Sequence, residues 1–371
     1  MLFPVITTPR RDPPSSVTSR RQEYWRWIEP LRTSKEVRST AFHAEKERAI
    51  IMRRLLVAAG VAFAAVTSVS AQTFPSKPVR IIVPFPPGGG LDIVARLYAP
   101  RLADIWKQQV IVDNRAGAAG TIGTEIAAKA PPDGYTVYFG TMGTFTVNPL
   151  LYPKIAFDIG RDFAPLTHLV DVHFGMYVHP SLPVKSVKEF IALAKARPGQ
   201  INFSSSGAGG APHLAGELLK RTANINVVHV PYRGSGPSFA DLLGGHVQAT
   251  FDSLVQALPD IKGGRLRALA VLGPSRSPLL PDVPTMQQAG IAGYELTNWF
   301  GMAVPAATPK DILNQIYGDL ARVSKTAEMR QKLQGMGAEP IATPPDAFAA
   351  RIQAETAKWT RIVKEAGIKA E

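Results

Sequence analysis

Two glycine-rich loops hold the residues whose types and spacing are most suited to binding chemistry. In the first, VPFPPGGGLDIVAR (83–96), an apolar run ends at Phe85 and a helical pattern follows three consecutive glycines. In the second, FSSSGAGGAPHLAGELL (203–219), three serines and three glycines precede a helix expected near Pro212. The backbone N–H groups of a helix N-terminus lack intrahelical acceptors and carry the positive end of the helix dipole. Both loops are therefore typical of anion-binding sites.

The residues that are missing from these loops favour a carboxylate over a phosphate. The first loop lacks the Lys-Ser/Thr pair of a Walker loop and the G-x-G-x-x-G spacing of a dinucleotide-binding turn. Asp92 would repel a nearby phosphate, although helix capping is an alternative role for it. His213 lies on the first turn of the second helix, where it either points at an anion or packs against the protein. Neither of the loops at 84–92 and 204–213 contains Lys or Arg, so we expect a mono- or dicarboxylate clamped without a metal.

Other candidates follow strand-like runs whose ends are expected to face the same cleft. Thr141 and Asn148 follow the run at 136–140. Arg233 either pairs with a distal carboxylate of the ligand or is a surface cation. Asp252 either accepts a hydrogen bond from a ligand amino or hydroxyl group or caps the helix that follows it.

The composition excludes several kinds of site. The 371 residues include no cysteine, which excludes disulfides, thiolate metal sites and a cysteine nucleophile. The seven histidines show no metal-ligand spacing, and there is no G-x-S-x-G nucleophile elbow. We therefore expect no metal, no cofactor and no catalytic residues. An α/β enzyme acting on a small carboxylic acid is the alternative from another functional class.

The net charge of +13 is unevenly distributed. Residues 1–51 hold 10 Lys/Arg against 6 Asp/Glu, and residues 52–71 add two Arg. From Gln72 onward there are 30 basic and 23 acidic residues, which leaves +7 without a basic run. We therefore expect no nucleic-acid partner for the main body of the chain.

Residues 52–71, MRRLLVAAGVAFAAVTSVSA, have the layout of a secretory signal peptide. Two arginines precede an apolar stretch of twelve residues (55–66) and a small-residue cleavage site. The stretch is short for a membrane span, and a buried core helix is the alternative. We expect translation from Met52 and export to the periplasm. Residues 1–51 would then be a mis-assigned or disordered extension.

From residue 77 onward, short β-branched runs alternate with helical patterns. This alternation predicts an α/β fold with mainly parallel strands. In a third glycine-rich segment (114–126), close packing of a helix on the sheet is the expected reason for the glycines. The predicted strands are 79–85, 110–114, 136–140, 201–205, 227–232, 248–252 and 267–272. The predicted helices are 91–105, 121–129, 187–196, 212–222, 254–262, 309–324, 326–334 and 345–366.

Seven ordered segments carry a family resemblance that covers the chain from about residue 75 to its C-terminus. They are PFPPGGGLDIVAR, VIVDNRAGAAGTIGTEIAAKAPPDGYTV, VNPLLY, FSSSGAGGAPHLAGELL, VPYRGSGPSFADLLGGHVQATFDS, GRLRALAV and WFGMAVPAATP. Together they resemble the solute-binding proteins of tripartite tricarboxylate transporters, the Bug-type periplasmic receptors. Seven segments in order are far more specific than any single glycine motif.

The resemblance implies a two-lobed periplasmic binding protein of type II-like fold, with a cleft between the lobes. The chain would cross twice, near 170–178 and 294–301, where Trp299 and Phe300 are expected to pack in the core. Lobe 1 would then contain 72–172 and 297–371, and lobe 2 would contain 173–296. The resemblance also implies ligand contacts from the loops at 84–92 and 204–213. The residues implied are Phe85, Pro87, Gly88, Gly89, Asp92, Ser204, Ser206, Gly207 and His213.

The expected function follows from the resemblance together with the two loops. A monomeric receptor would capture a small carboxylate between its lobes and present it to the integral-membrane subunits of a transporter. A receptor that hands its closed form to a membrane sensor kinase is an equally open alternative.

Overall fold

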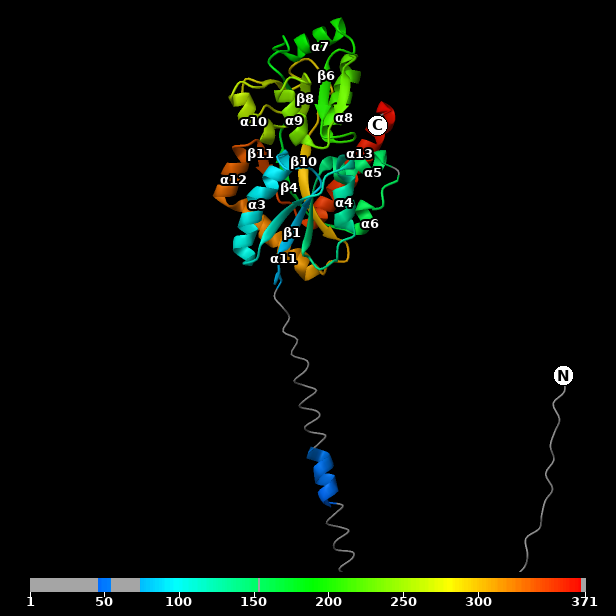
Figure 1. Cartoon of the computed structure of the whole chain (residues 1–371), viewed down its shortest axis with the longest axis vertical. Coiled ribbons are helices and arrows are strands. Elements are labelled where there is room, and N and C mark those ends of the chain that lie inside the picture. Colours follow the sequence, from blue (N-terminus) through cyan, green and yellow to red (C-terminus); the bar gives the residue numbers. More distant parts are fainter. Residues whose placement is uncertain (1–45, 55–73, 153, 368–371) are drawn as a thin grey trace, which may run out of the picture. The chain divides into compact units, whose positions relative to one another are not determined.

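The structure, a computed structural model, describes residues 46–54, 74–152 and 154–367. The chain divides into two units, Met1–Ala71 and Gln72–Glu371. In the first unit, residues 46–54 form an exposed helix (Figure 1). Residues 1–45 of the expected extension and 55–71 of the expected signal peptide lie outside the described residues. Within the described ranges, no helix is both long enough and apolar enough to cross a bilayer.

The second unit contains two β-sheets, each accompanied by helices (Figure 1). The larger sheet has the strand order β11-β4-β10-β3-β1-β2, and the smaller sheet has the order β7-β6-β8-β5-β9. The strands of the larger sheet are β1 (Val79–Val83), β2 (Val110–Asn114), β3 (Thr136–Thr141), β4 (Phe163–Val172), β10 (Asn298–Pro305) and β11 (Ala338–Pro340). The strands of the smaller sheet are β5 (Phe174–Val178), β6 (Asn202–Ser205), β7 (Val228–Pro231), β8 (Ala249–Ser253) and β9 (Arg267–Val271).

The helices follow the strands as the alternating pattern predicts, and several begin at a side-chain cap. Ser186, Ser253 and Thr326 each accept a hydrogen bond from a first-turn N–H of the helix that they precede. Beside the larger sheet lie α3 (Gly90–Trp106), α4 (Thr121–Ala128), α5 (Asn148–Leu151), α6 (Ile159–Asp162), α11 (Lys310–Lys325), α12 (Ala327–Gln334) and α13 (Pro345–Ala366). Beside the smaller sheet lie α7 (Val187–Ala196), α8 (Ala211–Ala223), α9 (Ser235–Leu243) and α10 (Leu254–Lys262).

The expectation of mainly parallel strands is wrong for the strands that link the two sheets. The local strand–helix units are parallel: β1 pairs with β2 and β3, and β6 pairs with β7 and β8. By contrast, β10 lies antiparallel between β3 and β4, and β5 lies antiparallel between β8 and β9. Only His173 separates β4 from β5, so the chain enters the smaller sheet directly from the larger one. A strand arriving from the other sheet runs against the local units, and this makes both sheets mixed.

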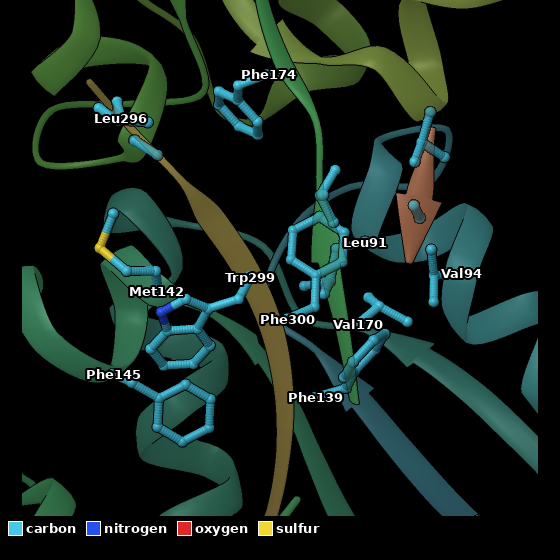
Figure 2. Packing of buried hydrophobic residues seen from close by; sticks show 14 of the residues in the cluster. Leu91, Val94, Phe139, Met142, Phe145, Val170, Phe174, Leu296, Trp299 and Phe300 are labelled. Carbon is cyan, nitrogen blue, oxygen red and sulfur yellow. The ribbon is translucent and has the colours of Figure 1, made fainter. Parts of the chain in front are cut away.

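The core of the larger sheet is aromatic around β10. Trp299 is fully buried, and its ring centroid lies 5.7 Å from that of Phe145 and 5.4 Å from that of Phe348. Figure 2 shows Trp299 and Phe145 together on one side of β10, with Phe300 on the other. The prediction that Trp299 packs in the core is therefore confirmed, and this packing anchors the strand that returns from the smaller sheet.

Glycines in the third glycine-rich segment allow the predicted close packing. A Cβ on Gly123 of α4 would lie 2.5 Å from the Arg115 carbonyl oxygen and 2.7 Å from the Pro84 Cα. Backbone atoms cannot move aside cheaply, so only glycine fits there. This holds α4 against the segment that follows β1 and fixes one wall of the region described next.

Candidate ligand-binding site

A pocket lies where loops from both sheets meet, with about 490 Å³ of empty space when the open solvent at its mouth is included. Its lining comes from the ends of β1, β3 and β8, from the crossing strands β5 and β10, and from the beginnings of four helices. None of the described residues that line it is Lys, Arg or His. The lining residues are Phe85, Gly89, Gly90, Leu91, Asp92, Thr141, Phe174, Ser206, Gly210, Ala211, Pro212, Ser235, Asp252, Ser253, Asn298 and Phe300.

Four helix N-termini converge on this cavity. Residues of the first turn of α3 and α8 line it, and so do Ser235 of α9 and Ser253, the N-cap of α10. Each N-terminus presents first-turn N–H groups that have no intrahelical acceptor, with about half a positive charge. The cavity can therefore attract an anion without a cationic side chain.

In the first loop, Asp92 already occupies the helix N-terminus. The Asp92 carboxylate is 3% exposed and accepts hydrogen bonds from the Gly88 N–H (2.9 Å), Arg96 Nε (3.0 Å) and Asn114 Nδ2 (3.0 Å). Burial alone would raise the pKa of Asp92, but these donors outweigh it and leave the pKa lowered. Asp92 is thus an ionised internal acceptor, and the amide of Gly88 points at it rather than at a ligand.

In the second loop, neutral groups hold the backbone. The Gly207 N–H donates to Ser205 Oγ (3.1 Å), and the Gly209 N–H donates to His213 Nδ1 (3.1 Å). The φ angles of these glycines are +130° and +85°, a region that favours glycine. Two amides of this loop are therefore turned inward, and the loop is held by neutral rather than charged acceptors.

Three stacked rings lie next to the second loop. The His213 and His229 rings lie 4.1 Å apart at 26°, and Phe203 stacks on the other side of His229 at 5.0 Å. His229 Nε2 lies 2.6 Å from Ser205 Oγ. Burial lowers the pKa of His229 to about 3, with a further contribution from the neighbouring His213. His229 is therefore neutral at ordinary pH, and the stack connects β7 to the ligand loop.

The N-terminus of α8 carries no resident acid. No acidic residue lies in its first turn, and no side chain caps it; its N-cap is Gly210. Ser206 is 8% exposed and lines the cavity, and no described residue forms a hydrogen bond with its hydroxyl. A Cβ on Gly210 would lie 2.9 Å from Ser206 Oγ, which places this hydroxyl beside the beginning of α8. Pro212 has no N–H, and the Gly210 N–H donates to the Gly207 carbonyl. The free Ser206 hydroxyl and the nearby Ala211 N–H together form an arrangement that can bind a carboxylate.

A second buried carboxylate, Asp252, lies beside α9 and α10. Its oxygens accept hydrogen bonds from Ser235 Oγ (2.7 Å) and the Ser253 N–H (2.6 Å). Burial raises the pKa of Asp252 to about 6, although these two donors favour the ionised form. Asp252 therefore supplies the negative charge that faces the N-termini of these two helices.

The remaining wall is largely apolar and lies on the crossing strands. Phe174 of β5 and Phe300 of β10 are 4% and 3% exposed, and Leu91 of α3 is 4% exposed. Figure 2 shows Phe300 beside Leu91, with Phe174 farther along toward the smaller sheet. Asn298, 2% exposed, adds one neutral polar group whose Oδ1 has no hydrogen-bond partner.

The loops of the two sheets approach closely at the edge of the cavity. A Cβ on Gly90 would lie 2.8 Å from Ser253 Oγ, and one on Gly234 would lie 2.4 Å from Pro86 Cδ. Residues of the first loop thus pack directly on segments that precede α9 and α10. The tight fit places the two sides of the cavity in contact.

The structure brings six of the thirteen predicted site residues into the cavity lining: Phe85, Gly89, Asp92, Thr141, Ser206 and Asp252. The others lie outside it. Pro87, Gly88 and Arg233 are exposed. Ser204 is fully buried and accepts from Ser238 Oγ, and Asn148 donates to the Ala119 carbonyl. Gly207 and His213 make the internal loop contacts described above.

Sequence reasoning missed the lining residues on the crossing strands and on α9. Ser235 follows Gly234 in another strand–glycine–helix turn, VPYRGSGPSFADLL. This turn is a signal of the same kind as the two ligand loops. Phe300 was expected only as core packing, but it also lines the cavity. Phe174 and Asn298 gave no comparable local signal, because their position follows from where β5 and β10 cross.

Comparisons with known proteins agree on one family. A family model described as "Tripartite tricarboxylate transporter family receptor" matches residues 94–368. Protein BugT of Bordetella pertussis is 36% identical over 322 residues, which cover 86% of this chain and 99% of BugT.

Comparison with solved structures agrees with this family assignment. R. palustris Rpa4515, solved with adipate, has a TM-score of 0.78 and 36% identity, over 80% of this chain and 99% of that one. MatC (Rpa3494) from Rhodopseudomonas palustris, solved with bound malate, has a TM-score of 0.75 and 30% identity, over 78% of this chain and all of that one.

Proposed function

The chain belongs to the tripartite tricarboxylate transporter receptor family, a family of two-lobed periplasmic solute-binding proteins rather than enzymes, and we propose that it is a receptor for a small carboxylate. The α8 N-terminus carries this proposal. It combines the Ala211 N–H with the Ser206 hydroxyl, which has no partner among the described residues, and it has no acid in its first turn. The relatives solved with adipate and malate support a carboxylate as the ligand class.

We further propose that the ligand is held between two lobes and that the loaded protein is presented to a membrane transporter. Lobe 1 would comprise 72–172 and 297–371, and lobe 2 would comprise 173–296. The cavity lining from both sheets supports a clamp, and closure about crossing strands is the usual motion of such proteins. The receptor acts as a monomer. Export through the signal peptide at 52–71 would leave Gln72 as the first residue, which N-terminal sequencing of the exported protein would reveal.

The proposal is tested by thermal unfolding of the purified full chain against a panel of carboxylates. The protein is first denatured and refolded to remove any co-purified ligand. An acid at about 100 times its dissociation constant should stabilise the folded state by about 2.7 kcal/mol, seen as a higher melting temperature. A panel of mono-, di- and tricarboxylates without any shift would overturn the receptor proposal.

A further inference from the structure

Resting on the proposed function, we infer that the ligand carries a single carboxylate on an apolar body. The preferred class is an aliphatic or aromatic monocarboxylic acid rather than a dicarboxylate. Three features of the cavity carry this inference: the balance of charge at the helix N-termini, the position of the free hydroxyl, and the apolar wall.

The charge balance leaves room for one anion. Asp92 faces the N-terminus of α3 and is itself paired with Arg96. Asp252 accepts hydrogen bonds at the beginnings of both α9 and α10. Each helix N-terminus is equivalent to about half a positive charge. Asp252 therefore balances α9 and α10, and the buried Asp92 carboxylate, whose charge is shared with the half-exposed Arg96, occupies the N-terminus of α3. The N-terminus of α8 is the one of the four that lacks an acid in its first turn or against it.

The free polar groups gather at that same helix. The Ser206 side chain is more than nine-tenths buried, lines the cavity and has no partner among the described residues. Its hydroxyl lies beside Gly210, the N-cap of α8. A ligand carboxylate placed here accepts hydrogen bonds from the Ser206 hydroxyl and the Ala211 N–H, while the rest of the ligand extends along the cavity.

The rest of the cavity offers little to a second carboxylate. Its walls toward the crossing strands are Leu91, Phe174 and Phe300, all nearly fully buried. Asn298 is neutral, and none of the lining residues described is a cation. An ionised group placed there would lose its hydration without a compensating charge, and the Asp252 carboxylate would repel it. An apolar chain or ring gains from the same walls.

The test compares acids that differ by one carboxylate, by titration calorimetry on the refolded full chain. Hexanoate is compared with adipate, and benzoate with terephthalate. We expect the monoacid of at least one pair to bind at least about tenfold tighter than its diacid. Diacids that bind equally or more tightly in both pairs would overturn the inference and leave the receptor proposal standing. No binding of any acid in the wider panel would instead overturn the receptor proposal.

A substitution tests the charge balance independently. Asp252→Asn removes one resident charge; its Oδ1 can still accept from the Ser253 N–H, and its Nδ2 can donate to Ser235 Oγ. The ratio of the diacid to the monoacid dissociation constant should then decrease. The melting temperature of the variant checks that it is folded. An unchanged preference in a folded variant would overturn the role given to Asp252. The comparison of acids on the unsubstituted protein stands even if this variant fails to fold.

Discussion

The two glycine-rich loops look alike in sequence but have different electrostatic environments. In the first loop, the Asp92 carboxylate takes the Gly88 amide and matches the N-terminus of α3. In the second loop, Ser205 and His213 take the inward amides, and the N-terminus of α8 meets no acid. One loop is therefore already neutralised, while the other retains its attraction for an anion. Glycines followed by a helix predict the backbone conformation of an anion-binding site. Whether that site can accept an anion depends on whether an acidic side chain of the protein already faces it.

The largest effect on this contrast should come from giving the second loop an acid, with Gly210→Asp. The φ of Gly210 is −67°, an angle that other residues adopt, and aspartate is a favoured N-cap. Its carboxylate would face the N-terminus of α8 and repel the ligand. We expect affinity for the carboxylate identified by the panel to fall about 100-fold or more, with the melting temperature kept or raised. Titration calorimetry and thermal unfolding measure the two effects.

Gly210→Asn is the matched control, because it has nearly the same size without the charge. A Cβ at this position lies close to Ser206 Oγ, so both variants share some crowding. If asparagine weakened binding as much as aspartate, crowding rather than charge would explain the loss.

A smaller effect is expected for Ser206→Ala. The substitution removes one hydrogen bond to a charged ligand, which corresponds to about a tenfold loss of affinity. Stability should change little, because the hydroxyl has no partner among the residues that the structure describes. Ser204→Ala is the comparison: Ser204 is bonded to Ser238 and should affect stability more than affinity. An unchanged dissociation constant in Ser206→Ala would show that the ligand carboxylate does not bind at the N-terminus of α8.

The first loop should respond in the opposite way. Asp92→Asn disturbs a buried carboxylate with three donors, so the free energy of unfolding should fall by about 2 kcal/mol. Affinity should fall less than in Ser206→Ala. Chemical denaturation measures the free energy of unfolding, and titration calorimetry measures the affinity for the ligand. A large loss of affinity with unchanged stability would make the first loop the anion site.

The last contrast between the two loops concerns the pH dependence of stability. The folded-state pKa of His229 lies at about 3, below that of an exposed histidine, so protonation favours the unfolded chain. Its contribution to stability is complete above about pH 6.5 and is lost as the pH falls toward 3. The pKa of Asp92 is also lowered, so its contribution is kept until the pH falls below the ordinary aspartate range.

Between about pH 6.5 and 4, the second loop should therefore lose stability while the first does not. Urea unfolding of the unsubstituted protein and His229→Phe at several pH values measures the difference, at most about 1.4 kcal/mol per pH unit for one proton. The phenylalanine variant lacks this titration, so its curve should be flatter. Parallel curves for the two proteins would contradict the predicted role of His229.

Local pattern was enough to place most strands and helices. For example, the predicted helix at 187–196 has these same bounds, because Ser186 caps it and its apolar residues keep helical spacing. The antiparallel crossing strands were not predictable in the same way. Gly301 of β10 pairs with Gly140 and His168, far away in sequence, and no local signal reports such partners.

The site shows the same limit. The glycines pointed to the loops, and Ser206 and Asp252 could be selected because they end predicted strands. That Asn114 would also bond to Asp92 depends on the pairing of β2 with β1, which a single sequence does not specify. Phe174 and Phe300 line the cavity only because two strands cross beside it.

The close fit of Gly234 on Pro86 affects the rate of ligand exchange as well as the shape of the cavity. With the loops of both sheets in contact, a bound acid can depart only after they separate. Its residence time would then be set by how often the crossing strands bend, and less by the number of hydrogen bonds it makes.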